Sequence, residues 1–299
     1  MIRADCTIAV SLEEPSILQD RFEYRYEERH PGIPRVSFFS PLLAPGSTFA
    51  CLGSVLGIHP TTAWILDEVR VLIEAAFAMP PDPTPQRLKE IQTTASELHN
   101  RISRLPVSGP VPTAQSLSDS GAVDGPKPLS LLPTYPDFSP SDSSSVSPPP
   151  LEPPRSAPPH ELDPLYTAVR LSAVLYTNAV ATLRPLSEVC SEEDALAVLM
   201  ASWRIPLARW RSMLGIFVWI MLSIVPTVHQ RTGSGRISAK VHTRFAKSIL
   251  QCGWMQMSLE NWAACEGSMQ GALCFQRWLQ QNRTNDERAR MPEQTTPPS

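Results

Sequence analysis

The sequence predicts an all-α fold, a multi-helix domain interrupted by a long disordered Pro/Ser-rich insert. Apolar residues recur at spacings of three and four in several stretches, which is the period of an amphipathic helix. No stretch alternates in hydropathy for long enough to predict a sheet. The 32 prolines outnumber the 13 glycines and cluster in one part of the chain, which indicates an unfolded stretch within a helical protein.

Changes in composition divide the 299 residues into five segments. Residues 1–47 are predicted to be a poorly ordered lead-in, and residues 283–299 a disordered tail. Residues 48–105 and 161–282 are predicted to be two helical blocks, separated by the insert over 106–160. We expect the second block to pack with the first, because its buried-type helices need apolar partners.

The first block contains two predicted helices. One runs from about Thr61 to Ala78 and stops before Pro80, because proline cannot continue a helix. The next has Thr84 as its N-cap candidate and Pro85 at its first position, where a missing N–H costs nothing. Its apolar seam is formed by Leu88, Ile91, Ala95, Leu98, Ile102 and Leu105. The seam favours packing within one domain over a dimerising coiled coil, which needs more heptads.

The predicted insert holds 15 Pro and 12 Ser. Such a composition cannot bury enough apolar surface to offset the entropy of ordering the chain. Its Ser-Pro steps at Ser139 and Ser147 fit phosphorylation sites or polyproline ligands, but a spacer is the simpler interpretation.

The second block contains five predicted helices. Asp163 followed by Pro164 is a start signal, and Ser191 with Asp194 resembles a capping box for a helix that ends near Ser202. The other three helices are expected around residues 217–219, over 237–251 and over 258–281. Residues 213–228 form an apolar stretch of roughly 24 Å as a helix, short of the roughly 30 Å hydrocarbon core of a membrane, so they predict a buried core helix.

The chain carries no clustered cysteines and no signal peptide pattern. The cysteines are Cys6, Cys51, Cys190, Cys252, Cys265 and Cys274. Their wide spacing predicts reduced thiols in an intracellular protein. The N-terminus has no adequate apolar run after Arg3, so we do not expect a secretory signal.

No catalytic or metal-binding motif is present at the required spacing. The histidines are His30, His59, His99, His160, His229 and His242. No two of them lie four residues apart, so a zinc site built on one helix is unsupported. We therefore predict no catalytic, cofactor-binding or metal-binding residues, no cofactor, and a protein that is not an enzyme.

Charge is distributed unevenly along the chain. Residues 1–160 hold 12 Lys and Arg against 18 Asp and Glu, whereas residues 201–299 hold 12 against 5. A stripe of basic residues is expected on the helix over 237–251: Arg236, Lys240, Arg244 and Lys247. It fits phosphate or an acidic partner segment, although a solvated face is the simpler interpretation. The tryptophans of this region are expected mostly in the core: Trp203, Trp210, Trp219, Trp254, Trp262 and Trp278.

Four apolar segments occur in an order that is similar to one known family. They are Gly57–Leu72, Arg170–Leu186, Met213–Pro226 with its Gly215, Phe217, Trp219 and Leu222, and Leu259–Leu279 with its closing Phe275, Gln276, Arg277, Trp278 and Leu279. Together they resemble the C-terminal regulatory region of fungal-specific zinc-cluster transcription factors. The resemblance covers most of residues 49–282 except the insert. It implies an all-helical regulatory domain, a nuclear role in transcription control and an N-terminal zinc cluster held by six closely spaced cysteines.

That cysteine cluster is absent from this sequence, so direct, sequence-specific DNA binding is not expected. Loss of the module and a gene model that begins too late both explain its absence. We expect a transcription-regulator-like interaction domain in the nucleus, or otherwise the cytoplasm, without a membrane association. Its partners would be proteins, either the transcription machinery or a DNA-binding relative, and a dimer stays open. The alternative is a helical small-molecule-binding protein or an enzyme with an unrecognised site.

Overall fold

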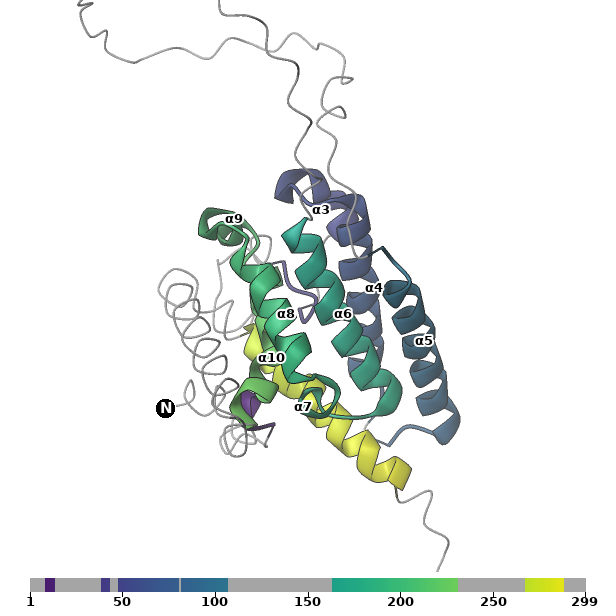
Figure 1. Cartoon of the computed structure of the whole chain (residues 1–299). Helices are drawn as coiled ribbons and strands as arrows, with labels where there is room; N and C mark the ends of the chain where they lie inside the picture. The colour runs from purple at the N-terminus through teal and green to yellow at the C-terminus, as the bar shows by residue number, and fades with distance from the viewer. Residues whose placement is uncertain are drawn as a thin grey trace, which may run out of the picture. The chain divides into compact units, whose positions relative to one another are not determined.

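The structure, a computed structural model, describes six stretches of the chain: residues 9–13, 39–43, 48–80, 82–106, 163–230 and 267–287. All of them belong to one compact unit, formed by Met1–Pro110 with Leu162–Ser299; the second unit is Val111–Glu161. The described part is 81% helical and contains no strand (Figure 1), which confirms the predicted all-α class. Residues 107–160 of the predicted insert and the predicted helix over 237–251 lie outside the described residues.

Three helices form the first block. They are α3 (Phe49–Leu56), α4 (Pro60–Phe77) and α5 (Pro85–Ser103). The bounds of α4 and α5 agree with the prediction to within two residues. The Thr84 hydroxyl accepts a hydrogen bond from the N–H of Arg87, which confirms the predicted cap of α5. Local sequence signals therefore locate both long helices of this block.

The short helix α3 has no counterpart in the sequence-based prediction. Its N-terminus is held by a distant side chain, since the Asp67 carboxylate accepts from the N–H groups of Phe49 and Ala50 at 2.9 Å each. These two N–H groups have no partner within their own helix. Asp67 lies on α4, so this capping interaction depends on the packing of α3 against α4.

The second block begins with three helices, of which the first and the third follow their predicted start signals. They are α6 (Pro164–Thr182), α7 (Leu186–Val189) and α8 (Glu192–Trp203). The Asp163 side chain accepts from the N–H of Leu165, and Ser191 and Asp194 form a complete capping box. The four-residue helix α7 was not predicted.

Two further helices and a C-terminal one complete the described part. They are α9 (Leu207–Ser212), α10 (Leu214–Gln230) and the helix over 267–287. Helix α10 continues through Pro226. Proline removes one backbone hydrogen bond, and the burial of Thr227 and Val228 beyond it keeps the helix packed in the core. None of the helices in the described stretches is long and apolar enough to cross a membrane.

The core is built around α6. This helix contacts α4 and α5 of the first block and α7, α8 and α10 of the second, as the central position of α6 in Figure 1 also shows. Tyr176 of α6 stacks on Trp219 of α10, with ring centroids 5.2 Å apart, and Phe275 of the C-terminal helix lies 5.3 Å from Tyr176. The apolar stretch around Trp219 is therefore core, as predicted.

Part of the predicted lead-in over residues 1–47 packs on this core. Ala9 and Val10 are buried in a helical turn, and Ser40 and Leu42 are buried in a separate short segment. The second segment fits because Gly215 has no side chain: a Cβ there would lie 2.4 Å from the Phe39 carbonyl oxygen. Local periodicity does not predict such contacts, because the residues that these two segments contact lie more than 150 positions away in the sequence.

Two details of the C-terminal half differ from the expected pattern. The helix over 267–287 continues five residues into the segment expected to be a disordered tail, and Arg283 in that extension bonds to Glu188 at 2.7 Å and Glu287 at 3.0 Å. Trp210, Trp219 and Trp278 are buried, in agreement with the expectation that most tryptophans of this region lie in the core, and Trp203 is 61% exposed at the last position of α8. Trp254 and Trp262 lie outside the described residues.

Candidate functional site

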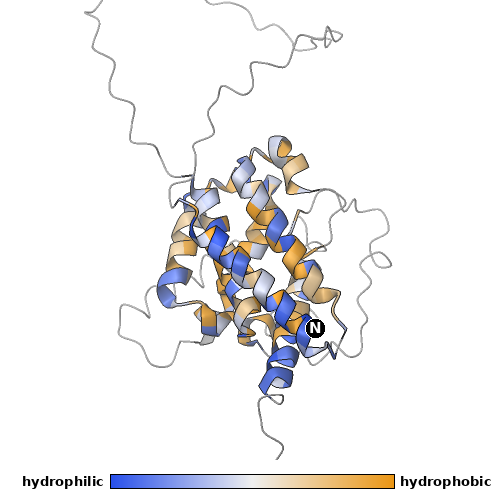
Figure 2. Cartoon of the chain, turned by 90° about the vertical axis from the view of Figure 1, so that its right-hand side faces the viewer, coloured by the Kyte–Doolittle hydropathy of each residue, from blue (hydrophilic) through white to orange (hydrophobic). Residues whose placement is uncertain are grey.

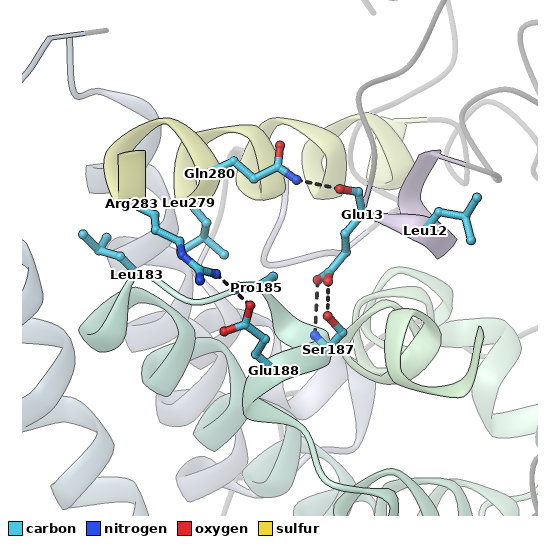
Figure 3. Close-up of a pocket in the computed structure, with 9 residues that line it drawn as sticks. All are labelled: Leu12, Glu13, Leu183, Pro185, Ser187, Glu188, Leu279, Gln280 and Arg283. Carbon is cyan, nitrogen blue, oxygen red and sulfur yellow. Dashed lines mark hydrogen bonds and ion pairs between the residues drawn. The ribbon is translucent and has the colours of Figure 1, made fainter. Parts of the chain in front are cut away.

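A polar pocket of about 260 Å³ lies where the N-terminal turn, α7 and the C-terminal helix meet (Figure 3). It is lined by Leu12, Glu13, Leu183, Pro185, Ser187, Glu188, Leu279, Gln280 and Arg283. These residues come from three parts of the chain that are far apart in sequence. The pocket therefore exists only because the lead-in segment docks on the second block.

The polar groups of this pocket bond to one another. The Glu13 carboxylate accepts from the N–H of Ser187 at 3.3 Å and from the Ser187 hydroxyl. Gln280 donates its side-chain N–H to the Glu13 carbonyl oxygen at 2.6 Å, and Gln276 donates in the same way to Val10 at 3.0 Å. Figure 3 shows the bonds of Glu13 to Ser187 and Gln280, which fasten residue 13 to α7 on one side and to the C-terminal helix on the other.

The electrostatics of the pocket also fit a structural role. Burial raises the pKa of the Glu13 carboxyl, the hydrogen bonds from Ser187 oppose that rise, and the nearby Glu188 adds to it. Glu13 also has a φ of 54°, a left-handed conformation that costs energy for a residue with a side chain. We interpret this cluster as a structural contact that holds the N-terminal turn in place and has little hydrogen-bonding capacity left for a ligand.

A second recess of about 380 Å³, the α4–α5 groove, lies between α4 and α5. It is lined by Glu68, Val71, Leu72, Ala75, Ala78, Met79, Arg87, Glu90, Ile91, Thr94, Glu97, Leu98 and Arg101. On each helix these positions recur every three or four residues, so each helix presents one continuous stripe to the groove. Figure 2 views the side of the molecule on which α5 lies in Figure 1, and it shows hydrophobic and hydrophilic segments alternating along the helices.

The floor of the groove is apolar and its α4 wall is apolar too. Leu72, Ile91 and Leu98 are buried at the bottom, 3 to 7% exposed. On the α4 wall, Val71 is 57% exposed, and the small side chain of Ala75 next to it is also exposed. An exposed valine beside an apolar recess leaves hydrophobic surface in water that a partner's side chain would cover.

One end of the groove is closed by a charged and aromatic cluster. The Arg101 guanidinium lies 3.7 Å from the Glu68 carboxylate and 4.9 Å from the centre of the Trp64 ring, over which it stacks. Trp64 in turn donates its indole N–H to Glu68 at 3.0 Å. Because Arg101 is near the end of α5 and Trp64 near the start of α4, the two helices run antiparallel.

The other wall, on α5, carries charged residues. Arg87, Glu90, Glu97 and Arg101 lie along one stripe of α5, directly beside its buried seam. Glu90 accepts a hydrogen bond from Gln86 at 3.1 Å. Within the described residues, neither Glu90 nor Glu97 has an ion pair, whereas Arg101 is paired with Glu68. The groove therefore combines an apolar floor with an acidic middle on one wall.

The sequence predicts no site residues. Among the described residues, no three or more His, Cys, Asp or Glu side chains lie close enough together to hold a metal ion. His59 caps α4 by accepting from Thr61, and His99 contacts Thr177 at 3.3 Å. Cys51 and Cys274 are free thiols, and the Cys190 thiol donates a hydrogen bond to the carbonyl oxygen of Ser191 at 3.4 Å. The basic stripe over 236–247 lies outside the described residues.

The sequence analysis does not predict the α4–α5 groove. The sequence contains a signal for it, since the apolar residues Val71 and Ala75 lie outside the helix face formed by the buried Ile65, Val69 and Ile73. A second, smaller apolar strip of this kind is hard to distinguish from the scattered apolar residues of an ordinary surface.

Comparison with protein-family models, with curated proteins and with solved structures found no match to this chain. The resemblance to zinc-cluster regulators thus remains an expectation from the sequence.

Proposed function

We propose that this chain is a helical regulatory and interaction domain that acts on transcription through protein partners. The observation that carries the proposal is the α4–α5 groove, an apolar recess with an exposed valine on one wall and charged residues on the other. Grooves of this kind bind amphipathic helices, whose apolar residues at every third or fourth position fill the recess. The order of apolar segments along the chain supports the transcriptional part of the proposal.

The partner would be a component of the transcription machinery or a DNA-binding relative, and the chain would act in the nucleus. In this function the domain does not read DNA itself, and it is not an enzyme. It would reach a promoter through a bound protein, so bringing it to DNA artificially should reproduce its effect.

A tethering experiment tests the proposal. The full chain is fused to an unrelated DNA-binding domain, and expression of a reporter gene with the matching operator is measured. We expect the fusion to change reporter expression relative to the DNA-binding domain alone, and Val71→Glu to abolish that change because it places a charge at the groove.

Val55→Glu is the matched control. Val55 is 77% exposed on α3 and does not line the groove, so the same substitution there should leave the effect intact. Melting temperatures of both variants should stay close to that of the wild type, because both side chains are largely exposed. A fusion without effect on the reporter, or equal loss in the two variants, would contradict the proposal.

A further inference from the structure

We propose that the α4–α5 groove selects one class of partner: an amphipathic helix with basic residues two turns apart along one flank. This inference rests on the proposed function, because it names the chemistry of the partner that the same groove binds. It follows from the shape of the groove, from the distribution of charge on its walls and from the spacing of two glutamates.

The shape of the groove fits a helix. Its two walls are antiparallel helices, and its α4 wall is made of small and medium apolar side chains, among them Val71, Ala75 and Ala78. Small residues allow the backbone of a partner helix to approach closely. Larger apolar side chains of that helix then reach the floor formed by Leu72 and Ile91.

The charge on the walls determines which helix fits best. At the closed end, Arg101 is compensated by Glu68. In the middle of the α5 wall, Glu90 and Glu97 face the groove without an ion pair within the described residues. A partner with acidic residues at this flank would meet like charge, whereas lysine or arginine there would be attracted.

The spacing of the two glutamates adds a geometric condition. Glu90 and Glu97 are seven residues apart on one helix, so their positions differ by two turns, or about 10.5 Å along the axis. A partner helix that lies along the groove matches both carboxylates when its own basic residues are also seven positions apart. The apolar residues of the partner then lie on the adjacent face.

Residues 236–251 of this chain have this pattern in their sequence, so a synthetic peptide of that sequence is a suitable probe. It carries Lys240 and Lys247 seven positions apart, with Val241 and Phe245 on the adjacent apolar face of a helix. A second peptide with Arg236→Glu, Lys240→Glu, Arg244→Glu and Lys247→Glu keeps the apolar face and reverses the charge of the basic flank. Binding of each labelled peptide to the full chain is measured by fluorescence anisotropy at low salt.

We expect the basic peptide to bind at least about fivefold more tightly than the reversed one, the size expected for two exposed ion pairs. A chain with Glu90→Lys and Glu97→Lys should show the opposite preference, because the charge on its wall is reversed. Raising the salt concentration should reduce the preference in both cases, since salt screens exposed charges. Val71→Glu in the full chain should weaken the binding of both peptides, and Val55→Glu should leave the binding of both unchanged.

Three outcomes overturn the inference. If both peptides bind equally and Val71→Glu abolishes both, the groove is a docking site as the proposed function requires, but it does not select a basic helix. If neither peptide binds, or if Val71→Glu leaves binding unchanged, the groove is not a docking site and the proposed function loses its support as well. If sedimentation shows the full chain forming a dimer that Val71→Glu dissociates, the occupant is a second copy rather than a partner helix.

Discussion

The Tyr166 hydroxyl donates a hydrogen bond to the carbonyl oxygen of Pro106 at 2.7 Å, across 60 residues of sequence. Next to it, the Arg170 guanidinium donates to the carbonyl oxygens of Ile102 and Ser103 at 3.2 and 2.8 Å. These carbonyls belong to the last turn of α5, and the Ile102 carbonyl also accepts from the N–H of Leu105 at 3.2 Å. The start of α6 thus caps the end of α5. The contact holds Pro106, the first residue of the predicted insert, next to Tyr166, which follows the end of the insert.

This contact predicts that residues 110–158 can be deleted with little effect on stability. Because Pro106 and Tyr166 are already adjacent, the shortened connection has to span only a small distance, and a shorter loop costs less closure entropy. We expect the melting temperature of the deletion variant to stay within a few degrees of the wild-type value. A larger decrease would show that the deleted residues stabilise the helical domain.

Trp219→Ala should destabilise the fold by about 3 to 5 kcal/mol, the range for truncating a large buried aromatic residue. Trp219 is fully buried and stacks on Tyr176, so its removal leaves a cavity between α6 and α10. Urea midpoints measure the change in the free energy of unfolding. Trp203→Ala is the control, since Trp203 is 61% exposed. A loss below about 1 kcal/mol for Trp219→Ala would be incompatible with a core position.

Gly215→Ala should destabilise the protein, although alanine normally favours a helix over glycine by roughly 0.5 to 1 kcal/mol. The added Cβ would lie 2.4 Å from the Phe39 carbonyl oxygen and 2.9 Å from the Ser40 nitrogen, and backbone atoms cannot move aside as a flexible side chain can. We expect a loss of about 1 to 3 kcal/mol, the usual range for overpacking.

Gly53→Ala is the matched control for this substitution. A Cβ at Gly53 of α3 would meet the Ile58 carbonyl oxygen at 3.5 Å, an ordinary contact, so alanine there should be neutral or stabilising. Thermal or urea unfolding of the two variants compares them directly. Equal stability of both would mean that the segment over 39–43 does not pack on α10.

Glu13→Gln should reduce the pH dependence of stability. The pKa of Glu13 is raised in the folded protein by burial, above its ordinary value of 4.5. Folding therefore favours the protonated carboxyl. This contribution to stability is present below pH 4.5 and is lost as the pH rises through the folded-state pKa. Glutamine keeps a neutral side chain at every pH, and it can still accept from the Ser187 N–H and donate to its hydroxyl.

At neutral pH we thus expect the Glu13→Gln variant to be at least as stable as the wild type, and the two should converge as the pH falls toward 4.5. Urea unfolding at several pH values measures this difference. The neighbouring charges, Glu188 and Arg283, form an ion pair at 2.7 Å and are common to both proteins. If the variant is less stable than the wild type at neutral pH only, the stability difference has the opposite sign, which contradicts a raised pKa of Glu13.

Helix starts were the most predictable feature of this protein. Thr84, Asp163 and the pair Ser191 and Asp194 cap their helices as expected, because a cap joins a side chain to an N–H only two or three residues away. The burial of the stretch around Trp219 was predictable for a similar reason, since a segment that is apolar on all sides has to be covered by other helices.

The amino-acid sequence by itself determined the all-helical class, the starts of the long helices and the core position of α10, because each depends on interactions within a few residues or on local hydropathy. The tertiary structure decided the rest. It determined the capping of the start of α3 by the Asp67 side chain, the docking of Glu13 on Ser187, the exposure of Trp203 and the groove beside Val71. Each of these depends on which surfaces meet across tens to hundreds of residues, and such pairings have no signature in local periodicity.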